Sequence, residues 1–121
     1  MRLKMLRIYS IVLISYMATM HTGEIAFKND VFRRGGFGVM MTQGIQAMGD
    51  DVRGILESVR NYSKFTPDND PYGERDFGCL NWKGEQVFWK IDYYDQALQY
   101  GEDPMSPACK RVLTVMKADE Y

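Results

Sequence analysis

The chain has 121 residues, of which 45% are hydrophobic and 26% are charged. This composition is typical of one soluble globular domain and excludes a disordered chain or a repeat array. The formal net charge is −1, but Arg2, Lys4 and Arg7 lie in an atypical head, and without them 12 basic residues stand against 16 acidic ones. A surface of this kind lacks the clustered cations that neutralise phosphates, so we do not expect nucleic-acid binding.

The head, residues 1–23, has a basic start followed by residues 8–23 without any Asp, Glu, Lys or Arg. Its apolar run is shorter than the roughly 20 residues of a membrane span but fits the roughly 7 to 15 of a secretory signal. No small-x-small cleavage triplet follows, so a signal-like segment, a docked helix and a false translation start all stay open. We prefer a cytoplasmic protein whose single domain covers residues 24–121, with no membrane span and with export as the alternative.

The first helix is predicted at residues 23–34, where apolar side chains lie mostly on one side and a glycine pair supplies the stop. These side chains are Ile25, Phe27, Val31 and Phe32. The side chains of residues 37–42 then alternate between two faces, which predicts a short strand with one buried face.

The second helix opens at Asp50 or Asp51, because apolar residues recur from Val52 to Val59 at the spacing of one helix face. Gly54 weakens this helix, and we expect it to permit close packing on a sheet. A long connection rich in turn residues follows.

A hairpin with its turn at Lys83 and Gly84 is the clearest strand signal. Its register pairs positions whose numbers sum to 167, so Leu80 faces Val87. Asp92 is then placed to meet Arg75 or to lie near Lys90. One face then forms a core: Leu80, Trp82, Val87, Trp89, Ile91 and Tyr93. With a last strand near residues 110–118, the fold is α+β: about four mainly antiparallel strands with two helices packed on one side.

Metal and catalytic motifs are few. Cys79 and Cys109 show no metal-binding spacing and read as small core residues, and His21 is the only histidine. These residues cannot supply the four ligands of a structural zinc or a histidine-based catalytic pair. The strings "DFG" and "GGFG" lack the companion motifs of kinases and phosphate loops.

A carboxylate cluster is the main alternative site. Asp70, Glu74 and Asp76, with Asp92 across the hairpin, are candidates to hold Mg²⁺ or Mn²⁺, which prefer oxygen ligands. The competing interpretation, which we prefer, assigns the stretch to turn formation by Asp68 and Asn69 with a positive φ at Gly73, and it needs no cofactor. Asp76 remains anomalous, because an unpaired carboxylate on the apolar face costs several kcal/mol unless it is paired, at the sheet edge or functional.

The candidates for partner contact are aromatic and basic: Tyr72, Tyr94, Tyr100 and Arg75. Tyrosine and arginine are enriched at protein interfaces. The sequence indicates no oligomeric state.

Several strings together resemble a family of small bacterial proteins, mostly proteobacterial and often associated with plasmids or prophages, that is filed as a domain of unknown function. The strings are "KNDVFRR", "VMMTQGIQAMG", "FTPDNDPYGERDFG", "VFWKIDYYD", "YGEDP" and "RVLTVMKADEY". The resemblance implies a domain that begins near Glu24 and a mobile-element setting, and it supplies no catalytic residues.

The leading hypothesis is therefore a non-enzymatic accessory or inhibitor protein of a mobile element that binds another protein. The alternative is a divalent-metal-dependent hydrolase or nucleotide-handling enzyme that uses Asp70, Glu74 and Asp76.

Overall fold

The protein is described by a computed structural model that covers residues 22–36 and 38–121. A helix occupies residues 22–35 and is called here the N-terminal helix. The remaining elements, in chain order, are β1 (Val39–Met41), α2 (Gln43–Gln46), the 3₁₀ turn η1 (Gly49–Asp51), α3 (Val52–Arg60), β2 (Phe77–Trp82), β3 (Glu85–Tyr94), β4 (Lys110–Lys117) and the 3₁₀ turn η2 (Ala118–Glu120). Residues 22 and 23 of the head are part of the N-terminal helix, and the predictions made for residues 1–21 lie outside the described residues.

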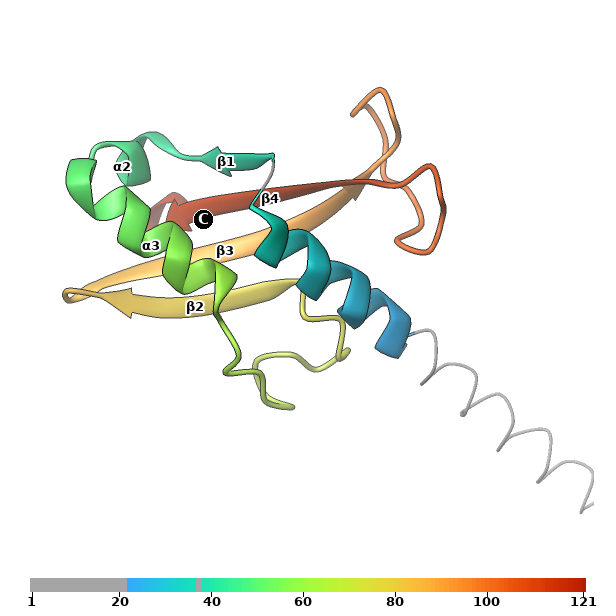
Figure 1. Ribbon diagram of the computed structural model, residues 1–121, viewed down its shortest axis with the longest axis horizontal. Coiled ribbons are helices and arrows are strands. Elements are labelled where there is room, and N and C mark those ends of the chain that lie inside the picture. The colour runs from blue at the N-terminus through green and yellow to red at the C-terminus, as the bar shows by residue number, and fades with distance from the viewer. Residues whose placement is uncertain (1–21, 37) are drawn as a thin grey trace, which may run out of the picture.

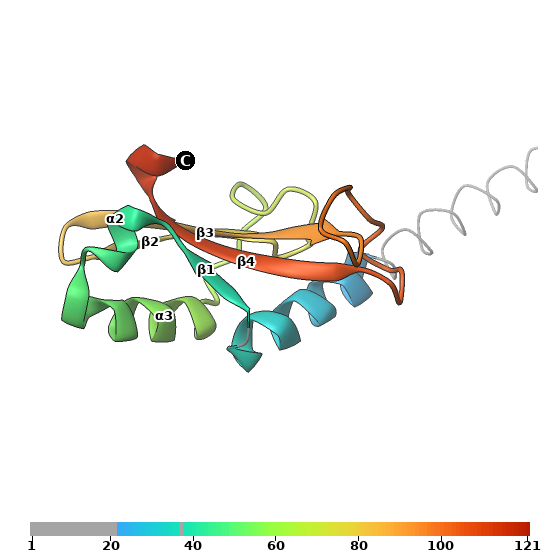
Figure 2. The same ribbon diagram turned by 90° about the horizontal axis from the view of Figure 1, so that it is seen from above.

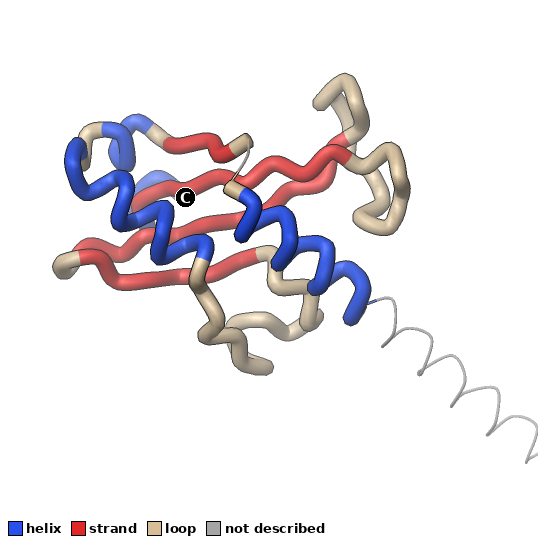
Figure 3. The backbone as a smooth tube through the Cα atoms, viewed as in Figure 1, coloured by secondary structure: helices blue, strands red, loops and turns tan. Residues whose placement is uncertain are grey.

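The strands form one sheet in the order β1-β4-β3-β2 (Figure 1). β2 and β4 both pair with β3 in antiparallel fashion, whereas β1 runs parallel to β4 at the edge. The predicted α+β class with four mainly antiparallel strands is therefore confirmed. Figure 3 shows two long loops, residues 61–76 and 95–109, which connect α3 to β2 and β3 to β4.

The β2–β3 hairpin has the predicted turn and register. Lys83 and Gly84 have φ of 50° and 89°, as the right-handed twist of a two-residue hairpin turn requires, and Leu80 faces Val87. The pairing of Arg75 with Asp92 was wrong. Arg75 has φ of 56° and precedes the start of β2, so it leaves the ladder, and Asp92 instead forms an ion pair with Lys90 at 3.1 Å.

The core lies between α3 and one face of the sheet. Ile55 and Val59 of α3 are buried against the predicted core face of the hairpin and against two residues of β4, Leu113 and Val115. Gly54 allows the helix to approach closely, because a Cβ there would collide with the Trp82 ring. The expected role of this glycine is thus confirmed.

The N-terminal helix lies on the same side of the sheet as α3 (Figure 2). Its buried residues are Ile25, Ala26, Asn29, Asp30 and Arg33. The prediction that Phe27 and Val31 share one side of the helix with Ile25 was wrong, since Ile25 is buried whereas Phe27 and Val31 are 69% and 56% exposed. Residues two positions apart differ by about 200° around a helix, so burying Ile25 and Asn29 turns Phe27 outward.

The opposite face of the sheet carries an aromatic cluster. Phe77, Phe88 and Tyr121 form edge-on ring contacts at 5.4 to 6.0 Å between centroids, and η2 lies on this side (Figure 2). Cys79 shares this face and is exposed, while Cys109 is half-buried in a loop. The prediction of two core cysteines was therefore wrong: none of the described α-helices covers this face of β2, and Cys109 lies in a loop.

Within residues 22–36 and 38–121, none of the helices combines the length and the apolar character needed to cross a membrane.

Candidate functional site

The loop between α3 and β2 is organised by Asn69. Its Oδ1 accepts a hydrogen bond from the Thr66 amide and its Nδ2 donates to the Lys64 carbonyl, both at 2.8 Å. Gly73 has φ of 67° and donates its amide to the Asp70 carbonyl at 3.0 Å. The predicted turn chemistry is therefore confirmed for Asn69 and for the glycine.

The candidate carboxylates serve separate neighbours. Asp70 Oδ1 accepts a hydrogen bond from the Arg75 amide at 3.2 Å, and Glu74 Oε2 accepts one from the Tyr93 hydroxyl at 3.1 Å. Asp92 is held by Lys90. In the part of the chain that the structure describes, no three acidic, cysteine or histidine side chains are grouped so that they could hold a metal ion.

Asp76 precedes β2, an edge strand, and its carbonyl accepts a hydrogen bond from the Ile91 amide at 2.8 Å. Its carboxylate is half-buried, and no described side chain forms an ion pair with it. Burial raises the pKa of Asp76; its own backbone N–H opposes this rise, while the nearby charges of Glu74, Asp70 and Asp92 add to it. The position at the sheet edge explains how the chain tolerates this carboxylate on the apolar face.

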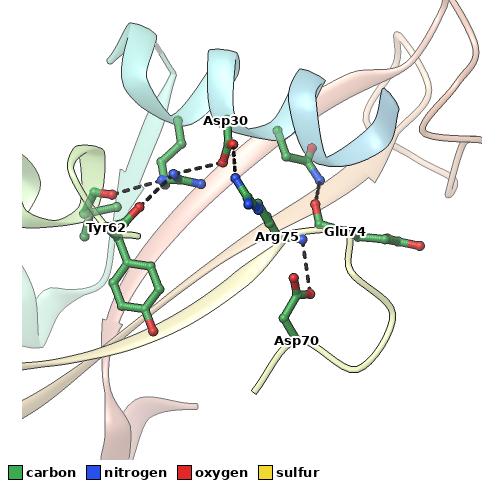
Figure 4. A network of polar contacts seen from close by, with 8 residues as sticks. Asp30, Tyr62, Asp70, Glu74 and Arg75 are labelled. Carbon is green, nitrogen blue, oxygen red and sulfur yellow. Dashed lines mark hydrogen bonds and ion pairs between the residues drawn. The ribbon is translucent and has the colours of Figure 1, made fainter. Parts of the chain in front are cut away.

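A polar network joins the N-terminal helix to the rest of the fold (Figure 4). Asp30 lies between two guanidinium groups: its Oδ1 is 3.0 Å from Arg33 Nη2 and its Oδ2 is 2.7 Å from Arg75 Nη1. Arg75 also lies over the Phe65 ring, with its Cζ 5.2 Å from the centroid. One carboxylate thus connects the helix to the loop before β2.

Arg33 is completely buried. Its Nε donates to the Val59 carbonyl and its Nη2 to the Tyr62 carbonyl, each at 3.1 Å. Burial lowers the pKa of Arg33, and the adjacent Asp30 carboxylate opposes this effect. The guanidinium therefore satisfies carbonyls at the end of α3, where helical hydrogen bonding runs out.

Asn29 is also completely buried and uses both ends of its amide. Its Nδ2 donates to the Glu74 carbonyl at 2.9 Å and to the Tyr93 hydroxyl at 2.8 Å, and its Oδ1 accepts from Arg111 Nε at 2.7 Å. Burial raises the pKa of Tyr93. The helix is consequently fixed to β3, β4 and the loop before β2 by one side chain.

Three of the predicted site residues line one shallow hollow of about 680 Å³: Asp70, Tyr72 and Arg75. Tyr72 is 82% exposed there. Tyr100 is 72% exposed on the other long loop, and Tyr94 is half-buried and bridges to Gly101. The predicted contact residues therefore do not form one surface.

A second hollow, called here the helix groove, runs between the outer side of the N-terminal helix and the end of the β3–β4 loop. Its volume is about 600 Å³, and its lining residues are Phe27, Lys28, Val31, Phe32, Gly38, Ser106, Pro107, Cys109, Lys110 and Arg111. A smaller hollow with Met105 in its wall adjoins it at Phe27. Exposed apolar side chains that gather in a hollow mark an interaction site more often than scattered ones do.

Sequence reasoning missed the helix groove. The available signal was the spacing of Phe27 and Val31, which are four residues apart and two residues out of phase with Ile25 and Asn29. That phase difference separates the two sets onto opposite sides of the helix. It did not indicate which set is buried, because the partners of Asn29 lie far away in the sequence.

The sequence model of one protein family, described as "Protein of unknown function (DUF3768)", matches residues 41–120. No curated protein and no solved structure matches the chain. The matched range contains Tyr62, Glu74, Tyr93 and Arg111, whereas the helix that these residues hold lies before it. The resemblance to a domain of unknown function is confirmed. The match covers well over half of the residues of the chain, and the chain therefore belongs to the DUF3768 family.

Proposed function

We propose that the protein is a non-enzymatic accessory or inhibitor protein of a mobile element and that it binds another protein through the helix groove. One observation carries this proposal: the N-terminal helix buries Asn29 and Arg33 while it exposes Phe27 and Val31. A buried polar residue and an exposed large apolar one are each informative in a folded protein. Here both occur on a single helix.

The exposure of Phe27 and Val31 in this orientation of the helix is unfavourable by hydrophobicity alone. Leaving a Phe or Val side chain in water forgoes about 1.5 to 3 kcal/mol relative to burial. The hydrogen bonds of Asn29 and Arg33 fix the helix in this orientation, so the apolar side chains cannot turn inward. A partner that covers Phe27 and Val31 recovers this free energy, and this supports a binding role.

The mobile-element setting rests on the family resemblance of the sequence. No contact among the described residues favours the metal-dependent alternative, because Asp70 and Glu74 direct their carboxylates to neighbouring groups of the fold.

Site-directed photocrosslinking in the native host tests the proposal. A benzophenone amino acid at position 27 of the full chain should form a discrete adduct with one other protein, which should co-purify in stoichiometric amount. The matched control is the same probe at Glu57, an exposed position on α3 outside the groove.

The double substitution Phe27→Ser and Val31→Ser should abolish co-purification without unfolding the chain, because both side chains face solvent. If no protein crosslinks at position 27, or if the two probes give the same adducts, the proposed binding role is wrong.

A further inference from the structure

We infer that the helix groove binds an acidic segment of the partner protein, in which apolar anchor residues are flanked by Asp or Glu. This inference rests on the proposed function and adds the chemistry of the partner. It follows from the charge of the groove, which differs in sign from the charge of the chain as a whole.

The lining of the helix groove contains three cations and no carboxylate. Glu24 lies in the wall of the adjoining hollow and forms no ion pair with a described residue. Lys28 and Lys110 are exposed, and neither makes an ion pair with any described residue. Arg111 is held by neutral groups, since its Nε donates to Asn29 Oδ1 and its Nη2 donates to the Pro104 carbonyl at 2.8 Å. The positive charge of the groove is therefore not neutralised by ion pairs within the described fold.

The carboxylates of Glu102 and Asp103 on the β3–β4 loop do not change this. Glu102 Oε1 accepts a hydrogen bond from the Asp103 amide at 2.9 Å, and Asp103 Oδ1 accepts one from the Met105 amide at 2.8 Å. Both carboxylates thus stabilise the loop backbone and form no ion pair with the groove lysines. An acidic segment can approach Lys28 and Lys110 and gain favourable electrostatics at the rim.

The apolar side chains set the spacing of the anchors. Phe27 and Val31 are four residues apart on one side of the helix, which places their Cβ atoms about 6 Å apart. Two apolar side chains of an amphipathic helix at i and i+4 match this spacing, which is the usual geometry of helix recognition in a groove. Carboxylates on the neighbouring positions of such a helix face the lysines.

Other occupants fit the charge less well. The head of this chain has three cations and no carboxylate in residues 1–21. A symmetric dimer through the groove brings like charges together, because each residue near the axis faces its own copy. An anionic membrane matches the charge, but a flat surface leaves a concave groove unfilled. Charge complementarity favours an acidic partner segment.

Peptide selection on the full-length protein tests the inference. A display library of random 16-residue peptides is selected on the wild-type chain and counter-selected on the Phe27→Ser, Val31→Ser variant. The enriched peptides should pair apolar residues at i and i+4 with several Asp or Glu residues. A synthetic peptide of this kind should lose about tenfold in affinity on Lys28→Glu, Lys110→Glu, a difference of about 1.4 kcal/mol.

A charge-swapped peptide, with Lys in place of each acidic residue, should bind the Lys28→Glu, Lys110→Glu variant more tightly than the wild-type chain. Unchanged urea midpoints for the lysine variant would verify that it is folded. Enriched peptides that are neutral or basic, and whose affinity does not respond to Lys28→Glu, Lys110→Glu, would overturn the acidic inference while the binding role stands.

Two further measurements decide between the classes of occupant. Binding to vesicles that contain phosphatidylserine, lost with Phe27→Ser, Val31→Ser, would overturn the inference in favour of a membrane surface. A concentration-dependent dimer that the same substitutions abolish would overturn it in favour of a second copy. Light scattering that shows a monomer, together with no vesicle binding, supports the acidic partner.

Discussion

The guanidinium of Arg33 lies over the indole of Trp89, with its Cζ 4.8 Å from the ring centroid. Both side chains are completely buried, so a cation from the N-terminal helix stacks on the central aromatic residue of the sheet. A cation over the face of a tryptophan is attracted by the ring quadrupole, most strongly when water is excluded. The contact therefore links the N-terminal helix, which precedes the range of the family match, to the centre of the core.

Arg33→Met should lower the free energy of unfolding by about 2 to 4 kcal/mol, as measured by urea denaturation. Methionine fills much of the volume but leaves the Val59 and Tyr62 carbonyls without their donor. Replacing a buried ion pair by apolar groups is neutral only when no polar partner is left behind.

Arg34→Met is the matched control, because Arg34 is the exposed neighbour on the same helix. It should change stability by no more than about 0.5 kcal/mol. Equal stabilities for the two variants would show that the buried network does not stabilise the fold.

Gly54→Ala should destabilise the protein, although alanine is the better helix former by about 1 kcal/mol. The reason is the Trp82 ring, which occupies the space that the new Cβ needs. Thermal denaturation should show a lower Tm for the single variant.

Trp82→Leu provides the test of cause. In the background of this smaller side chain, Gly54→Ala should be neutral or stabilising, because the collision is relieved. The same loss of Tm in both backgrounds would mean that the glycine is required for another reason.

Asp76→Asn should raise the urea midpoint at pH 7. Burial raises the pKa of Asp76 in the folded protein above its pKa in the unfolded chain. The folded protein therefore has its full stability below the unfolded pKa, where Asp76 is protonated, and loses part of it as the pH rises through the folded pKa. The amide removes this loss.

The gain from Asp76→Asn should therefore disappear below about pH 3.9, where an unfolded aspartate is itself protonated. Asp68→Asn, an exposed change in the preceding loop, serves as the control and should leave the midpoint unaltered at both pH values. A decrease in stability on Asp76→Asn at pH 7 would instead indicate that the charged carboxylate has a stabilising partner.

Glu120→Gln should lower the midpoint at pH 7. The Glu120 carboxylate accepts hydrogen bonds from Thr42 Oγ1 at 2.7 Å and from the Gly44 and Lys117 amides at 3.0 Å, and these contacts lower its pKa. The charged Glu120 carboxylate therefore stabilises the fold fully above the pKa of the unfolded chain, and this stabilisation is lost as the pH falls through the lower pKa of the folded protein.

The difference between wild type and Glu120→Gln should thus narrow as the pH falls below about 4.3, the ordinary pKa of glutamate. Asp119→Asn, an exposed change next to it, should show no such pH-dependent difference. A constant difference at all pH values would assign the effect to side-chain packing and not to charge.

The hairpin and α3 were predictable because their signals are local. The turn at Lys83 and Gly84 fixes the register of the residues on either side of it, and the regular apolar spacing from Val52 to Val59 identifies the buried face of a helix. Each of these inferences needs only a few neighbouring residues.

The orientation of the N-terminal helix and the position of Arg75 were not predictable in this way. Asn29 bonds to groups 45, 64 and 82 residues away in the chain, and Arg75 adopts a positive φ that is uncommon for a residue with a side chain. The candidate site depends on the orientation of this helix. Because the polar residues Asn29 and Arg33 lie on its inner side, Phe27 and Val31 line a groove on its outer side, and the local spacing does not show which side is the outer one.

The place of β4 within the sheet sets an order for folding. β2 and β3 are joined by a two-residue turn and can pair first, as neighbouring strands of a hairpin do within microseconds. β1 contacts the sheet through β4, and Val39 pairs with Leu113, far along the chain. β1 reaches the sheet only once β4 has docked on β3. Closing the long chain segment between β1 and β4 is therefore expected to be a late and slow step.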